Sequence, residues 1–322
     1  MFARLVLACL LACLLALGGG SAHAQAWPDK PVHVIVPFPA GGGTDIIARL
    51  VAAKLTEKWG QPFLVENRAG GNGNIGAQAV AQAKKDGYTV MVSTSALTIN
   101  PSLNENVGYR LGDFAPVILL ASSPYVLVVN PKVVSVTTVD EFIAYARSNN
   151  GQLTWASASE GNAEHLAGML LQHVAGFRMS HVPYKGGADA LKDVAGGHVG
   201  IGVIALPPVL PYLQSGQLRA IGTTDTRRAP QLPQVPTLSE TVPGVALPTW
   251  YAAWMPAGTP ADVVDRLHDA IDDILRQDEV RKRVIAIGFN PAGGPRGEFA
   301  RYVASEFDKY AAIIARVGLS PH

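Results

Sequence analysis

The sequence predicts an α/β protein built from parallel βαβ units. After Pro28, short apolar runs rich in β-branched residues alternate with stretches of helical periodicity, a pattern typical of parallel sheets with crossover helices. Glycine- or serine-rich loops follow three of the strands, at 41–44, 70–74 and 93–96. Because parallel strands end at the same edge of a sheet, these loops predict a ligand site at that edge.

The elements follow in order along the chain. Strands are expected at 32–36, 62–66, 88–93, 125–129, 153–157, 199–204 and 218–223, where the apolar runs are short. Helices are expected at 46–55, 75–84, 139–148, 163–174, 188–195, 260–276, 278–287 and 296–317, where apolar residues recur at turn spacing. The proline-rich stretch 230–248 is expected to be irregular and to cross back between domains. About 300 residues beyond the N-terminal segment suit two domains.

The loop 37–45 joins the first strand to the first helix and contains three consecutive glycines. Glycines allow a ligand to approach the backbone closely. Thr44 or Asp45 can cap the helix, and the free N–H groups of its first turn favour an anion. The alternative is an ordinary strand-to-helix turn, which also favours Gly and Thr.

Residues 1–26 have the features of a signal peptide. Arg4 precedes an apolar run from 5 to 17, too short to span a bilayer, and small residues give cleavage sites near Ala24 or Ala26. Export to the periplasm is therefore expected. A loose lipoprotein box ending at Cys13 leaves lipidation as the alternative.

The composition after residue 26 excludes several classes of protein. Both cysteines fall inside the signal segment, so the mature chain has no disulfide, thiolate nucleophile or cysteine-bound metal. Removing Arg4 leaves 25 Lys and Arg against 25 Asp and Glu, since the full chain has 26 and 25. No basic stripe is present, which argues against nucleic acid and membrane surfaces. No later apolar run is long enough to span a bilayer, so the mature chain is expected to be soluble.

No cofactor, metal site or catalytic centre is predicted. The run 71–76 matches G-x-G-x-x-G, but it lies several residues beyond its strand and lacks the expected downstream acid. His165 and His173 lie eight residues apart on one helix, too far to share a metal. Ser157 and Ser159 follow a strand without a G-x-S-x-G motif, so they are interpreted as hydrogen-bond donors in a polar pocket.

Several motifs in order along the chain together resemble the tripartite tricarboxylate transporter receptors, also called Bug receptors. They are Pro-Phe-x-x-Gly-Gly-x-x-Asp at 37–45, Glu-Asn-Arg-x-Gly-Gly-x-Gly-x-x-Gly at 66–76, Asn-Pro-Ser-Leu at 100–103, Val-Pro-Tyr-Lys-Gly at 182–186, Gly-x-Val at 197–199 and Leu-Pro-x-Val-Pro-Thr at 232–237. The match covers essentially the whole mature chain.

The resemblance implies a two-domain periplasmic binding protein of type II-like fold, with two crossovers and a ligand cleft between two mainly parallel sheets. Domain 1 would comprise 27–125 plus 249–322, and domain 2 would comprise 126–248. Such a receptor, monomeric and not an enzyme, would bind a small organic acid and serve membrane transporter subunits or a signalling partner. The alternatives are a periplasmic hydrolase on a similar scaffold and the effector-binding domain of a transcription regulator.

The resemblance also implies a set of ligand-binding residues. Carried onto this chain, they are Phe38, Ala40, Gly41, Gly42, Thr44, Asp45, Ser95, Ala96, Ser157, Ala158, Ser159, His165, Lys185, Gly186 and Ile204. Ile204 departs from the family, because relatives usually have an acid there. An apolar residue at this position would leave a ligand ammonium without a partner. We therefore expect a preference for acids that lack an α-amino group.

Overall fold

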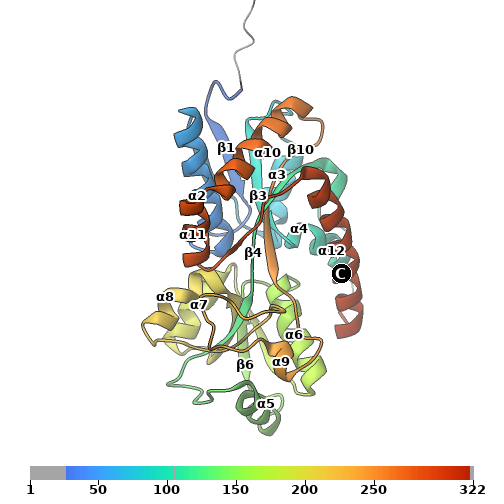
Figure 1. Ribbon diagram of the computed structural model, residues 1–322. Coiled ribbons are helices and arrows are strands. Elements are labelled where there is room, and N and C mark those ends of the chain that lie inside the picture. Colours follow the sequence, from blue (N-terminus) through green and yellow to red (C-terminus); the bar gives the residue numbers. More distant parts are fainter. Residues whose placement is uncertain (1–26, 105, 320–322) are drawn as a thin grey trace, which may run out of the picture.

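The computed structural model of the chain describes residues 27–104 and 106–319, which form two α/β domains (Figure 1). The predicted signal peptide, including Cys13, lies outside the described residues. Within the described residues, no helix is both long and apolar enough to cross a membrane. The two-domain binding-protein fold expected from the sequence is confirmed.

The first domain is built on a six-stranded sheet in the order β11-β4-β10-β3-β1-β2. Its strands are β1 (Val32–Val36), β2 (Phe63–Asn67), β3 (Thr89–Thr94), β4 (Phe114–Ser123), β10 (Thr249–Pro256) and β11 (Asn290–Pro291). The strands β1, β2 and β3 are parallel, whereas β10 runs antiparallel to both β3 and β4. The parallel strands therefore end together at the edge that faces the second domain.

The second domain is built on a five-stranded sheet in the order β7-β6-β8-β5-β9. Its strands are β5 (Tyr125–Val129), β6 (Thr154–Ser157), β7 (Ser180–Pro183), β8 (Ile201–Ala205) and β9 (Arg219–Thr223). The strands β6, β7 and β8 are parallel, and β5 runs antiparallel between β8 and β9. All residues of β5 and β8 are buried, as expected for strands covered on both faces.

Helices cover both sheets. Those of the first domain are α2 (Gly43–Trp59), α3 (Asn74–Ala81), α4 (Ala96–Leu103), α10 (Ala261–Arg276), α11 (Asp278–Ala286) and α12 (Arg296–Val317). Those of the second are α5 (Val139–Ser148), α6 (Ala163–Ala175), α7 (Gly187–Gly196), α8 (Leu206–Gln214) and α9 (Leu238–Thr241). Short 3₁₀ turns lie at Gly71–Gly73 and Leu111–Asp113.

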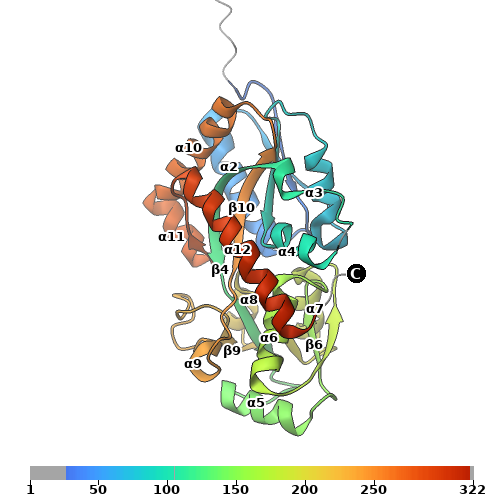
Figure 2. The ribbon, with the colours of Figure 1, turned by 90° about the vertical axis from the view of Figure 1, so that its right-hand side faces the viewer.

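The chain passes between the sheets twice. Strand β4 ends at Ser123 and β5 begins at Tyr125, so a single residue, Pro124, separates the two sheets. The return leads from the irregular segment after α9 into β10 at Thr249. Helix α12 runs beside both domains (Figure 2) and contacts α4 in the first and α6 in the second. The domain limits predicted from the sequence remain predictions.

Candidate functional site

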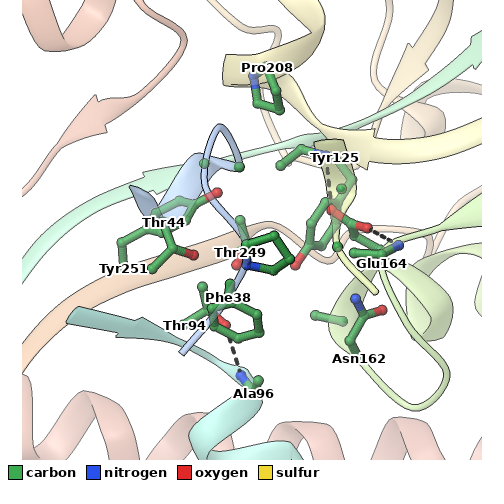
Figure 3. A pocket seen from close by; sticks show the side chains of 18 residues that line it. Phe38, Thr44, Thr94, Ala96, Tyr125, Asn162, Glu164, Pro208, Thr249 and Tyr251 are labelled. Carbon is green, nitrogen blue, oxygen red and sulfur yellow. Dashed lines mark hydrogen bonds between the residues drawn. The ribbon is translucent and has the colours of Figure 1, made fainter. Parts of the chain in front are cut away.

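A pocket with about 570 Å³ of empty space, counting the solvent at its mouth, lies between the two sheets (Figure 3). Both domains line it. The first domain contributes Phe38, Pro39, Gly42, Gly43, Thr44, Thr94, Ala96, Thr249 and Tyr251. The second contributes Tyr125, Ala158, Asn162, Ala163, Glu164, Gly186, Gly187, Ala205 and Pro208. The site is therefore incomplete in either domain alone.

The loop between β1 and α2 forms one wall of the pocket. Helix α2 begins at Gly43 with Gly42 as its N-cap, and no side chain caps it. The sequence-based prediction that Thr44 or Asp45 caps this helix is therefore wrong. Among the described residues, none accepts a hydrogen bond from the N–H groups of Gly42, Gly43 or Thr44. These donors remain free for an anion in the pocket.

Asp45 holds this loop in place. Its carboxylate accepts hydrogen bonds from the Gly41 N–H at 3.0 Å, from Arg49 Nε at 2.9 Å and from Asn67 Nδ2 at 3.0 Å. Burial by itself would raise the pKa of Asp45, but these hydrogen bonds together lower it. Asn67 also donates to the Phe38 carbonyl at 3.0 Å, which fixes the start of the loop. Asp45 thus positions the donors while its own charge is paired with Arg49.

Five helices begin at the pocket. They are α2, α4, α6, α7 and α8, which follow the carboxyl ends of β1, β3, β6, β7 and β8. Each helix N-terminus carries a partial positive charge, and the effect is strongest within its first turn. Residues at the start of every one of these helices line the pocket. The backbone alone therefore makes the pocket favourable for negative charge.

The side chains that line the pocket include no Lys, Arg or His. The only carboxyl group among them belongs to Glu164, in the first turn of α6, and only 6% of that residue is exposed. Glu164 accepts hydrogen bonds from the Ala158 N–H at 2.7 Å and from the Ala205 N–H at 3.2 Å. Burial raises the pKa of Glu164 to about 7, and these hydrogen bonds oppose the shift without cancelling it.

Two tyrosines line the pocket near Glu164 (Figure 3). Burial raises the pKa of Tyr125 and of Tyr251 far above the usual range, so both phenols stay neutral. A Cβ atom at Gly43 would lie 2.6 Å from the Tyr251 hydroxyl oxygen. Glycine is therefore needed at Gly43 so that the helix start and this hydroxyl can lie together.

The structure brings six of the fifteen predicted site residues to the pocket lining: Phe38, Gly42, Thr44, Ala96, Ala158 and Gly186. Gly41, Asp45, Ser95, Ser157 and His165 lie directly behind the lining or next to it in sequence. Ala40 and Lys185 are exposed. Ile204 is fully buried in the apolar core of the second domain and does not line the pocket. Its side chain therefore gives no reason for a preference against ammonium groups.

His165 and the half-buried His181 form an aromatic cluster with Trp155, and Ser157 lies beside it. The His165 and His181 rings stack with centroids 4.2 Å apart, and the Trp155 and His181 centroids lie 4.6 Å apart. Burial lowers the pKa of His165 to about 4 and that of His181 to about 3, so both rings are neutral at ordinary pH.

The contact of Ser157 with His181 does not resemble an activated nucleophile. Ser157 Oγ lies 2.8 Å from His181 Nε2 and donates to the Ser159 carbonyl at 3.2 Å. Among the described residues, no carboxylate is hydrogen-bonded to His181 to orient it as a base, and the tautomer of its ring decides whether it donates to Ser157 or accepts from it. Neither residue lines the pocket. In the described residues, no group of three His, Cys, Asp or Glu side chains is arranged to hold a metal.

Sequence reasoning missed twelve of the lining residues, and Glu164 is the most informative of them. An acid in the first turn of a helix is common, because it complements the helix dipole at the surface. The available signal was its position two residues after the polar loop 157–162, which contains the predicted donors Ser157 and Ser159. Tyr125, Thr249 and Tyr251 come from strands at the two crossings between domains.

Two contacts hold the domains together around the pocket. Ser159 Oγ donates to Asn72 Oδ1 at 2.6 Å, and Asn72 Nδ2 donates to Asn100 Oδ1 at 2.7 Å. On the other side, Gly186 lies against the ring of Pro39. The Ser159–Asn72 and Gly186–Pro39 contacts each join the two domains, whereas the Asn72–Asn100 bond lies within the first.

Comparison with known proteins gives the same architecture. The chain is 36% identical over 312 residues, 95% of this chain and 93% of the relative, to a UPF0065 protein from the tcbD-tcbE intergenic region of a Pseudomonas species. It is 34% identical over 299 residues to protein BugT of Bordetella pertussis, covering 92% and 91% of the two chains. Among solved structures, Rpa4515 of R. palustris with adipate superposes with a TM-score of 0.90 at 35% identity, covering 92% and 100%.

A second solved structure, MatC of Rhodopseudomonas palustris with bound malate, has a TM-score of 0.82 at 29% identity, covering 89% of this chain and all of MatC. The family model described as the tripartite tricarboxylate transporter family receptor matches residues 47–319. The family consists of solute-binding receptors, and nothing in the comparisons supports the hydrolase alternative. This chain belongs to the tripartite tricarboxylate transporter receptor family.

Proposed function

We propose that this protein is a periplasmic receptor that binds a small organic carboxylate in the interdomain pocket and delivers it to a tripartite membrane transporter. The observation that carries the proposal is the convergence of five helix N-termini on a pocket whose side chains include no cation. A carboxylate can be held there by backbone N–H groups and neutral hydroxyls. The relatives solved with adipate and malate support the same ligand class.

In this proposal, the ligand carboxylate lies against the free N–H groups of Gly42, Gly43 and Thr44. The facing wall, from Asn162 to Glu164 and at Gly187, belongs to the second domain. A ligand that contacts both walls stabilises the closed arrangement of the domains over the open one. Closure is thus coupled to binding through differential contacts, as a transport receptor requires.

A ligand panel tests the proposal directly. Native mass spectrometry of the freshly purified protein, and calorimetric titration with mono- and dicarboxylates, should reveal an acid that binds and is returned unchanged. A series of neutral amides of the same acids is the matched control, and these amides should bind at least tenfold more weakly. The proposal fails if no carboxylate binds, or if the amides bind as well as the acids.

Export and partnership complete the proposal. We expect cleavage near Ala24 or Ala26 and a monomeric mature chain without cysteine. Intact-mass measurement of the exported protein distinguishes this from lipidation of Cys13, which would add the mass of the acyl chains. Dependence of uptake of the identified acid on both this receptor and the large permease subunit would establish the transporter as the partner. A receptor that serves a signalling partner instead would leave uptake unchanged.

A further inference from the structure

If the buried carboxyl group of Glu164 were ionised, it would repel the carboxylate ligand proposed for this pocket. A bound carboxylate would meet one ionisable acid of its own sign and no cationic side chain. Two carboxylates close together in a desolvated site do not both stay ionised. Either Glu164 becomes neutral when an acid binds, or it pairs with a cation that the ligand itself supplies.

The surroundings of Glu164 favour the neutral acid. A ligand ammonium would have to lie among the starts of five helices, whose partial positive charge repels it. It would also need acceptors, whereas Asn162 Oδ1 already accepts from the His165 N–H at 2.8 Å. Neutral Glu164, by contrast, supplies the proton donor that an acidic ligand needs.

The two oxygens of Glu164 differ in a way that identifies the donor atom. Oε2 accepts the short hydrogen bond from the Ala158 N–H at 2.7 Å, as expected of the carbonyl oxygen of an acid. Oε1 has only the longer contact of 3.2 Å with the Ala205 N–H. Gly187, which lines the pocket, lies beside this oxygen: a Cβ atom there would be 3.7 Å from Oε1. Oε1 is therefore the oxygen suited to bear the proton.

We propose that Glu164 acts as a neutral acid whose Oε1 hydroxyl donates a hydrogen bond to a ligand oxygen. The receptor therefore selects acids without an ammonium group. At alkaline pH it takes up a proton when the ligand binds. The inference rests on the proposed function and adds its specificity-determining residue. Ketosteroid isomerase shows that a protein can keep a carboxylic acid neutral for hydrogen-bond donation.

The buried titratable groups that the structure describes around Glu164 titrate outside the relevant range. Tyr125 on β5 and Tyr251 on β10 have pKa values raised by burial, and His165 on α6 has its pKa lowered to about 4 by burial. On the facing loop, Asp45 is ionised and paired with Arg49.

The remaining charged side chains around the site face solvent. Lys185, before α7, and Glu160, before α6, are exposed, and Asp189 on α7 lies beside Lys192 at 3.6 Å. Their charges are screened by water and salt. A pH dependence of binding that disappears on substitution of Glu164 is therefore assigned to Glu164.

Calorimetric titration with adipate from about pH 6.5 to about pH 9, where adipate stays fully ionised, tests the inference. In buffers of different ionisation enthalpy, the wild type should take up nearly one proton per ligand at the alkaline end and only about a quarter of a proton at the acidic end, because the pKa of Glu164 is about 7. Its Kd should rise about tenfold per pH unit above neutrality. Glu164→Gln, which keeps a donor but cannot titrate, should bind without proton uptake or pH dependence. Glu160→Gln, which removes an exposed acid from the same loop, should behave as wild type.

The outcomes separate the two proposals. If the wild type binds adipate with a constant Kd and no proton uptake, the proposed role of Glu164 is wrong, but the proposed function is not. This measurement needs no variant. Tighter binding of aspartate than of succinate also overturns that role, because aspartate carries the ammonium group. Absence of binding by every acid at every pH overturns the proposed function, and this inference with it.

Discussion

Gly186 in the second domain lies against Pro39 in the first, so closely that a Cβ atom on Gly186 would be 2.7 Å from Pro39 Cγ. The backbone of Gly186 is extended at φ 176, which any residue adopts. The requirement for glycine is therefore steric, and it arises only when the domains meet. Both residues line the pocket.

Gly186→Ala is accordingly expected to impair closure but not folding. Overpacking costs roughly 1–3 kcal/mol, so ligand affinity should fall about 5- to 150-fold while Tm without ligand changes little. Calorimetry and thermal unfolding measure the two effects. Pro39→Ala removes the clashing atoms, and the double variant should regain most of the lost affinity. Equal affinity of Gly186→Ala and wild type would show that the two residues do not meet in the bound state.

Bulk at Gly42 is expected to block the anion site without straining the fold. Gly42 has φ −77, and a Cβ atom there would meet only the Pro39 carbonyl oxygen at an ordinary 3.6 Å. Gly42→Val should therefore fold normally and bind its acid at least tenfold more weakly, whereas Thr44→Val, which removes only a hydroxyl, should lose less. Gly112→Ala, with no atom within 4 Å of the added Cβ, is the matched control. If Gly42→Val binds the acid as well as the wild type does, the ligand does not bind at this loop.

The hydrogen bond between Ser159 and Asn72 is expected to favour the closed state modestly. One neutral hydrogen bond contributes roughly 0.5–1.5 kcal/mol, so Ser159→Ala should weaken binding about two- to tenfold. Asn72 has φ 53, and Asn72→Gly keeps this backbone conformation while removing the side chain. The two single variants and the double variant should have similar affinities in a titration, because either change removes the same interdomain bond, while the Asn72–Asn100 bond lies within the first domain. Additive losses would indicate separate roles.

The His165 and His181 pair is expected to make the fold acid-sensitive. Burial lowers both pKa values, to about 4 and about 3, from an ordinary value near 6.5. In this pH range the unfolded chain therefore binds protons that the folded protein does not bind. The free energy of unfolding falls as pH drops from about 6.5 towards these values.

His181→Gln tests this sign, because glutamine retains a donor for Ser157 and does not titrate. The free energy of unfolding, followed by tryptophan fluorescence in denaturant, should decline less steeply with acid in the variant than in the wild type. A variant with the wild-type slope between about pH 6.5 and about pH 4 would place the acid sensitivity elsewhere.

The regular parts of the fold could be predicted because local pattern and tertiary structure agree there. The expected strands 32–36 and 125–129 and helices 139–148 and 296–317 match the structure residue for residue. Helix α8 was missed because Pro207, Pro208 and Pro211 are breakers by propensity, although two of them lie in the first turn, where proline is tolerated. Strand β10 was missed because an antiparallel strand needs no crossover helix, which removes the βαβ pattern.

The site was predictable only where the backbone itself binds. The glycine loop at 41–43 has a local signature, and it lies at the pocket. The position of Ile204 relative to the pocket was not predictable, since every residue of β8 is buried and the sequence pattern does not indicate which face meets the cleft. Glu164 has only a weak local signature, its position after the loop 157–162, because what distinguishes it is its burial and its hydrogen bonds to the Ala158 and Ala205 N–H groups.

Helix α12 determines on which side of the molecule the two domains are expected to separate. Its Tyr310 and Ile314 are buried in the core of the second domain, whereas Phe299, nearer its start, packs against Trp250 of the first. Separating the domains at this helix would expose apolar surface at roughly 25 cal/mol per Å². Where Gly186 meets Pro39, the contact is a glycine backbone against one proline ring. The domains are therefore expected to tilt about an axis beside α12, so that ligand enters from the Gly186 side and the spacing along α12 stays nearly constant.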